Sequence, residues 1–201
     1  PSSPITKNAP IRFQRAEEFL RKNGFRVIEG KLTGKSDFYR SGSIMERAGE
    51  LNDLIRNPEV KCIMSTIGGM NSNSLLPYID YEQLIKTPKI IIGYSDMTAI
   101  LLGIYAMTGL ITYYGPAAVA SFGELAPYSD MTLKYFREIL QNPDEPPFTY
   151  EKPPFWTDEY IPWEEQKRAK TENINKLITV NPGIGRGRLI GGNLDTIQGI
   201  W

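Results

Sequence analysis

Two short apolar runs, each followed by glycine and then by a helical pattern, constrain the fold of this chain more than any other feature. The first run covers residues 60–67 and leads into Gly68 and Gly69, and the second covers 89–92 and leads into Gly93. The apolar residues are continuous rather than alternating, which is typical of parallel strands that are covered on both faces. The order strand, helix, strand, helix predicts an α/β fold with a doubly wound, mainly parallel sheet of the flavodoxin or Rossmann kind.

The other elements follow from periodicity and capping residues. Ser43 and Glu46 form a capping box, which opens a helix that ends at Asn57-Pro58. The pattern over 96–108 is strongly apolar and predicts a helix buried on most of its faces. The remaining predicted elements are helices over 11–23 and 129–141, a short helix or turn within 75–85, a helix that begins near Leu194, and strands over 25–28, 110–114, 176–181 and 189–190.

The composition changes after the helix over 129–141, which Asn142-Pro143 is expected to end. Prolines, tryptophans and charged residues fill 143–168, and the aromatic residues argue against free disorder. We expect three parts: an N-terminal α/β domain over 1–142, a connecting loop over 143–175 and the start of a C-terminal domain over 176–201. The chain is expected to be truncated at both ends.

The complete absence of histidine excludes several kinds of active site. A histidine-dependent mechanism cannot be complete within these residues, and we expect no metal and no cofactor. The 23 basic and 23 acidic residues balance, so binding of nucleic acid or of an anionic membrane is not expected. The single cysteine, Cys62, fits a reducing compartment. With no apolar run of about 20 residues and no signal peptide in view, we expect a cytoplasmic protein.

A serine stands where the second apolar strand turns into a helix. Gly93, Tyr94 and Ser95 follow the strand, and this layout is typical of a nucleophile elbow, in which the turn lifts the serine hydroxyl clear of the sheet. Met97 replaces the glycine normally expected two residues after the serine, so the pattern is a variant. The competing interpretation is that Ser95 or Asp96 only caps the helix, and both roles can coexist.

Glycines mark two other turns at the predicted carboxyl edge of the sheet. Backbone N–H groups of Gly69 and Asp96 could form an oxyanion hole beside Ser95, although an ordinary strand-to-helix turn explains Gly68 and Gly69 equally well. Asn193 ends a second glycine turn, which leads into a helix. The glycines of 183–188 do not form a GxGxxG loop and precede a strand, so a phosphate cradle and a dinucleotide-dependent dehydrogenase are disfavoured.

Four segments stand out by their order and spacing: 65–71 (STIGGMN), 75–80 (LLPYID), 93–98 (GYSDMT) and 187–194 (GRLIGGNL). Together they resemble the LD-carboxypeptidase family of serine peptidases, and most closely its microcin C self-immunity branch. The resemblance extends over the whole chain and favours Ser95 strongly as the nucleophile.

The resemblance implies a Ser-Glu-His triad in which Ser95 matches the nucleophile. Gly69 and Asp96 match the backbone donors of the oxyanion hole, and Gly68 and Asn193 are expected to bind substrate. The family's glutamate and histidine would lie in a C-terminal domain beyond residue 201, and its first strand would precede Pro1. This chain by itself is therefore expected to be inactive.

The microcin branch stacks a tryptophan of the connecting loop on the nucleotide base of its substrate. Residues 156–163 resemble that loop, and their spacing from Ser95 favours Trp163 over Trp156. From the residues alone, anchoring of the loop on the sheet domain is an equally good explanation of these tryptophans. The resemblance implies hydrolysis of an amide bond on the carboxyl side of an acidic residue, in a peptidyl or aminoacyl nucleotide or in the L,D-bond of a muropeptide.

A hypothesis of another class is a catalytically silent ligand-binding domain, which the missing histidine and the loop aromatics favour if the natural chain ends at Trp201. The expected partner in either case is a small molecule, and a homodimer is left open.

Overall fold

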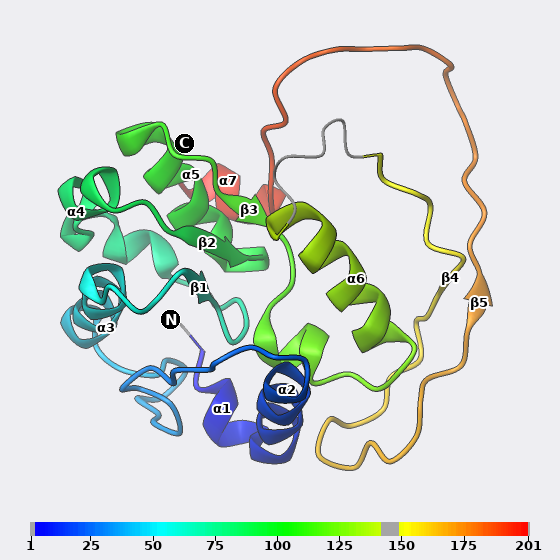
Figure 1. Ribbon diagram of the computed structural model, residues 1–201, viewed down its shortest axis with the longest axis horizontal. Coiled ribbons are helices and arrows are strands. Elements are labelled where there is room, and N and C mark those ends of the chain that lie inside the picture. The colour runs from blue at the N-terminus through cyan, green and yellow to red at the C-terminus, as the bar shows by residue number, and fades with distance from the viewer. Residues whose placement is uncertain (1–2, 142–148, 201) are drawn as a thin grey trace.

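A parallel sheet lies at the centre of the computed structural model, which describes residues 3–141 and 149–200 (Figure 1). Its three strands, in the spatial order β1-β2-β3, are β1 (Cys62–Met64), β2 (Ile90–Gly93) and β3 (Tyr113–Tyr114). Both pairings are parallel, with Ile63 beside Ile91 and Gly93 beside Tyr114. The predicted parallel α/β fold is thus confirmed, and parallel pairing brings the carboxyl ends of the three strands to one edge.

Helices cover both faces of this sheet. Ile63 and Ile91 belong to an apolar cluster with buried residues of α3, α4 and α5, whereas Ile92 packs on the other face with Phe122 and Phe136. Because the apolar residues of the strands are continuous, the strands contribute side chains to the apolar clusters on both faces of the sheet. The helices and helical turns are α1 (Ile5–Asn8), α2 (Pro10–Lys22), α3 (Ile44–Arg56), η1 (Ser72–Tyr78), α4 (Tyr81–Lys86), η2 (Ser95–Met97), α5 (Thr98–Thr108), η3 (Ala118–Phe122), α6 (Tyr128–Leu140) and α7 (Leu194–Ile200).

Most predicted helices are present within one or two residues of their predicted ends. The capping box is confirmed, because Ser43 Oγ accepts the Glu46 N–H at 3.3 Å and Glu46 Oε2 accepts the Ser43 N–H at 2.9 Å. The short helix α1 was not predicted. The predicted helix stop and domain boundary at Asn142-Pro143 lie outside the described residues, as do residues 1–2 and Trp201.

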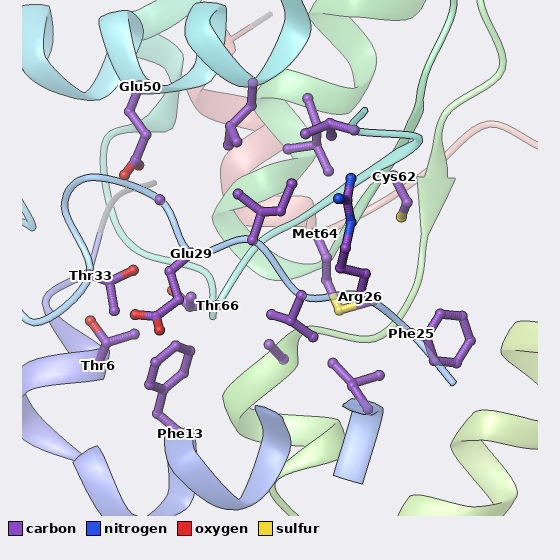
Figure 2. A pocket seen from close by; sticks show the side chains of 18 of the residues that line it. Thr6, Phe13, Phe25, Arg26, Glu29, Thr33, Glu50, Cys62, Met64 and Thr66 are labelled. Atoms are coloured by element: carbon purple, nitrogen blue, oxygen red, sulfur yellow. The ribbon is translucent and has the colours of Figure 1, made fainter. Parts of the chain in front are cut away.

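The predicted strand over 25–28 is wrong. A cavity of about 430 Å³ separates the segment 24–30 from β1, with Phe13 and Met64 among its lining side chains (Figure 2). The segment therefore lies outside the ladder of β1, and the Phe25 N–H instead donates to the Leu20 carbonyl at 3.1 Å. An apolar sequence becomes a strand only where a partner backbone lies within hydrogen-bonding distance.

The described part of the connecting loop, residues 149–175, makes a wide excursion beside the sheet domain (Figure 1). It contains a small antiparallel ribbon that was not predicted, formed by β4 (Phe155–Trp156) and β5 (Asn173–Ile174). The predicted strands over 176–181 and 189–190 are wrong, since these residues form no ladder among the described residues and Val180 and Leu189 are almost fully exposed. The predicted helix near Leu194 is confirmed as α7, which lies against α5. No helix in the described ranges is both long and apolar enough to cross a membrane.

A buried ion pair fastens the connecting loop to the sheet domain. Arg12, which is 1% exposed, donates to the Glu124 carboxylate at 2.8 Å and to Gln166 Oε1 of the loop at 2.5 Å. Lys170 lies 3.0 Å from the same carboxylate, and the Gln166 amide also donates to it. Burial alone would raise the pKa of Glu124, but these hydrogen bonds outweigh burial and lower the pKa from 4.5 to about 2.

The lowered pKa makes Glu124 a source of acid sensitivity. The carboxylate stabilises the fold fully above pH 4.5, and this contribution is lost as the pH falls toward about 2. We expect Glu124→Gln to lower the free energy of unfolding at pH 7 by roughly 3 kcal/mol, because Arg12 then keeps a buried charge without its counter-ion. Thermal melts between pH 7 and pH 3 should show a smaller acid-dependent loss in the variant than in the wild type.

Glu82→Gln is the matched control for this experiment, since the Glu82 side chain is 88% exposed and its lysine partner lies 3.9 Å away. Equal acid-dependent losses in wild type and Glu124→Gln would show that the buried pair does not set the acid response.

Candidate active site

Ser95 lies at the apex of a sharp turn between β2 and the helical turn η2. Its φ angle is +59°, a left-handed conformation that a serine adopts only when the surrounding structure enforces it. The side chain is half-buried. The strand, the strained turn and the helix predicted for a nucleophile elbow are all present.

Two glycines make this turn sterically feasible. A Cβ atom on Gly68 would lie 2.7 Å from Ser95 Cβ and 2.9 Å from Ser95 Oγ, and one on Gly93 would lie 2.9 Å from Met97 Cγ. The loop after β1 therefore touches the serine directly. A side chain at Gly68 would occupy the space next to the hydroxyl group.

A pocket of about 380 Å³ opens over this turn. The structure brings Gly69, Ser95, Asp96 and Asn193 together in its wall, so four of the six predicted site residues line one cavity. Gly68 is not among the lining residues, but its backbone lies directly against Ser95. The further lining residues, which the sequence analysis missed, are Met70, Asn73, Asp195, Thr196, Gly199 and Ile200.

Asp96 does not occupy an N-cap position, because Tyr94 precedes η2 and Met97 precedes α5, so the capping hypothesis is wrong for this residue. It is 5% exposed and accepts hydrogen bonds from the Ser72 N–H at 3.0 Å and from Ser72 Oγ at 2.7 Å. Ser95 does not cap the helix either, because the N-cap position of η2 is Tyr94. The carboxylate instead joins the serine turn to the loop that carries Gly69.

A buried arginine also holds the loop after β1 in place. Arg47 of α3 is completely buried, and its Nη1 donates to Asn71 Oδ1 at 3.0 Å. Burial, together with the charge of Arg40, lowers the pKa of Arg47, and the Asp96 carboxylate counteracts this. The loop after β1 is thus fixed at two consecutive residues, Asn71 and Ser72.

Asn193 lies at the entrance of α7 and is held by α5. Its N–H donates to Thr98 Oγ1 at 2.9 Å, and its Oδ1 accepts the Thr196 N–H at 2.9 Å. A Cβ on Gly192 would lie 2.6 Å from Thr98 Oγ1, so this glycine allows the close approach. The side-chain oxygen of Asn193 therefore caps α7 while the residue lines the pocket.

Trp163 lies outside the wall of this pocket. Its ring lies over the Arg12 guanidinium, 4.8 Å from the ring centre, and the neighbouring Glu164 accepts the Ile11 and Arg12 N–H groups at 3.1 and 3.2 Å. One face of the ring is thus engaged by a buried cation. These contacts indicate that this face of Trp163 helps to anchor the connecting loop on the sheet domain.

The pocket is lined by hydroxyl, amide, carboxylate and backbone groups, together with the apolar Met70 and Ile200. Within residues 3–141 and 149–200, no group of three or more His, Cys, Asp or Glu side chains could hold a metal ion. Burial raises the pKa of Cys62 to about 12, so this thiol is not a competing nucleophile. A serine beside two glycines at the carboxyl edge of a parallel sheet is suited to acyl transfer.

The sequence matches a known protein family over more than half of its length. Residues 1–115 match the model of the LD-carboxypeptidase N-terminal domain. The chain belongs to the LD-carboxypeptidase family. The resemblance noted in the sequence is therefore confirmed.

Individual LD-carboxypeptidase relatives extend the match over the whole chain. A protein of Vibrio cholerae named as a carboxypeptidase is 60% identical over 201 residues, and the microcin C7 self-immunity protein MccF of Escherichia coli is 54% identical over 202. The alignments cover 100% of this chain but only 60% and 59% of those proteins. A protein of Bacillus subtilis named as a murein peptide carboxypeptidase is 29% identical and is covered over 54% of its length.

Solved structures agree on the fold. Wild-type MccF without ligand matches with a TM-score of 0.95 at 54% identity, and the match covers 100% of this chain and 60% of that one. MccF in complex with aspartyl sulfamoyl adenosine matches with a TM-score of 0.96. The α/β fold described above is thus that of an experimentally determined LD-carboxypeptidase relative.

Gly68→Ala tests whether the loop after β1 is packed against Ser95 as described. We expect the alanine to lower the free energy of unfolding by about 1–3 kcal/mol, because its methyl group overlaps Ser95 and nothing nearby can move without disturbing the turn. Chemical denaturation measures the change. Gly49→Ala is the control, because a Cβ at this position in α3 meets no atom within 4 Å and should stabilise the helix by about 0.5–1 kcal/mol. Unchanged stability in Gly68→Ala would contradict the close packing.

Proposed function

We propose that this chain forms the nucleophile-bearing part of a serine peptidase of the carboxypeptidase type. The observation that carries the proposal is Ser95, held at a φ of +59° and opening into a pocket that Gly69 and Asp96 also line. A strained turn of this kind persists only when its surroundings enforce it, and the Asp96–Ser72 hydrogen bonds provide that support.

In the proposed mechanism, Ser95 Oγ attacks the carbonyl carbon of the scissile amide. The backbone N–H groups of Gly69 and Asp96 stabilise the oxyanion, and the amine leaves after it receives the proton that the serine has lost. Water then hydrolyses the acyl-enzyme ester and regenerates the hydroxyl group. Because the chain contains no histidine, we propose that the base and its orienting glutamate come from polypeptide outside these 201 residues.

The substrate class that we favour is an aminoacyl or peptidyl nucleotide. Its support is the similarity to MccF, which has been solved with aspartyl sulfamoyl adenosine, with glutamyl sulfamoyl guanosine and, as a tryptophan-to-phenylalanine mutant, with adenosine monophosphate. An active-site mutant of MccF replaces a serine, an asparagine and a lysine by alanine, and the pocket of this chain contains Ser95 and Asn193. We propose that Trp163 stacks on the base with the face opposite Arg12, and that Gly68 and Asn193 line the site of the acyl group.

The L,D-bond of a muropeptide is the second candidate substrate. The murein peptide carboxypeptidase named above supports it, and so does a muramoyltetrapeptide carboxypeptidase of Oxalobacter formigenes, which matches 66% of this chain with a TM-score of 0.59. Because these relatives are less similar to the chain than MccF is, the muropeptide is the weaker of the two candidate substrates.

The organisation of the protein remains part of the proposal. We propose a nucleophile domain over 1–142, a connecting loop over 143–175 and a second domain that begins within 176–201, together with a cytoplasmic location. A homodimer stays a prediction, which size-exclusion chromatography with light scattering can test.

Replacement of Ser95 by alanine is the decisive experiment. In the complete natural polypeptide that contains this chain, Ser95→Ala should lower kcat by at least about 10³-fold, because the nucleophile is lost while binding groups remain. Release of aspartate from aspartyl sulfamoyl adenosine and of the terminal D-alanine from a murein tetrapeptide, measured side by side, distinguishes the two substrates.

Ser36→Ala is the matched control, since Ser36 is an exposed loop residue far along the chain from the pocket residues. The melting temperatures of both variants should stay close to that of the wild type. Turnover that survives in Ser95→Ala would exclude the serine-peptidase mechanism, and hydrolysis of the tetrapeptide alone would exclude the nucleotide substrate.

A further inference from the structure

A tyrosine hydroxyl contacts the backbone of Ser95. The Ser95 N–H donates to Tyr114 Oη at 3.1 Å. Tyr114 is the last residue of β3 and lies beside Gly93 in the ladder, where the Gly115 N–H donates to the Gly93 carbonyl at 3.0 Å. The phenol therefore reaches the serine from the neighbouring strand, whose register with β2 is fixed two residues before the serine.

This hydrogen bond acts on the strained dihedral angle of Ser95. It fixes the peptide plane between Tyr94 and Ser95, on the N-terminal side of the residue. On the C-terminal side, Asp96 is fixed by its hydrogen bonds to Ser72. With both flanking groups fixed, Ser95 cannot relax from its φ of +59° to the more favourable negative range without breaking one of these contacts.

The position of Tyr114 is unusual for a residue that serves only the core. Its side chain is 52% exposed, whereas the preceding Tyr113 is half-buried and packs against the apolar cluster around Ile92 and Phe122. The phenol oxygen of Tyr114 accepts the Ser95 N–H, which leaves that N–H unavailable as an oxyanion donor. Tyr114 thus holds the serine turn by a hydrogen bond and buries little of its own side chain in the core.

We propose that Tyr114 is a positioning residue for the nucleophile. Its hydroxyl group keeps the Ser95 backbone in the left-handed conformation that directs Oγ into the pocket, and it leaves the oxyanion to Gly69 and Asp96. The inference rests on the proposed function, because positioning matters only if Ser95 reacts.

Tyr114→Phe removes the acceptor and keeps the ring. In the complete polypeptide we expect kcat to fall by about 10- to 100-fold while KM changes by less than about threefold, since a small displacement of the reacting atom lowers the rate without altering the binding groups. The rate of covalent labelling of Ser95 by a fluorophosphonate should fall by a similar factor. Tyr113→Phe is the matched control, and its kcat, KM and labelling rate should stay within about twofold of the wild type.

The outcomes separate this inference from the function on which it rests. If Ser95→Ala is inactive and Tyr114→Phe has wild-type kcat and labelling rate, Tyr114 is not a positioning residue and the peptidase mechanism stands. A higher KM at unchanged kcat would also overturn positioning, because it would show that the hydroxyl group only binds substrate. If Ser95→Ala stays active, the proposed function itself fails, whatever Tyr114→Phe shows.

Discussion

The hydrogen bonds between Asp96 and Ser72 join the two loops that line the pocket together with α7. One loop follows β1 and carries Gly68 and Gly69, and the other follows β2 and carries Ser95. Parallel pairing brings both loops to the same edge of the sheet, but pairing alone does not determine how closely they approach. A carboxylate that is 5% exposed requires hydrogen-bond donors, and Ser72 supplies two of them. These two hydrogen bonds therefore hold the glycine loop against the serine turn.

The parts of the fold that depend on short-range signals could be predicted. The capping box at Ser43 and the continuous apolar strands each have a local physical cause. The serine turn could be predicted for the same reason, because a strand, a glycine and a helix are adjacent in sequence. The grouping of Gly69, Ser95, Asp96 and Asn193 in one pocket required the resemblance as well, since Asn193 is distant along the chain.

The errors concern features that depend on partners distant in sequence. Residues 25–28 and 176–181 have apolar strand patterns, but no neighbouring strand satisfies their backbone groups in the described part of the chain. Aspartate is a common helix-capping residue, but the Asp96 carboxylate accepts hydrogen bonds from Ser72, which lies in the segment after β1. Tyr114 carries no local signal at all, because its importance arises only when β3 pairs beside β2.

The segment from Gln166 to Asn193 is attached to opposite layers of the molecule. Gln166 accepts a hydrogen bond from Arg12 of α2, which packs on one face of the sheet, and the Asn193 N–H donates to Thr98 of α5 on the other face. Between these two contacts the backbone makes a wide arc outside α6 before it reaches α7 (Figure 1). The long segment between Gln166 and Asn193 is thus held at both of its ends, which limits the entropy lost when it is ordered beside the domain.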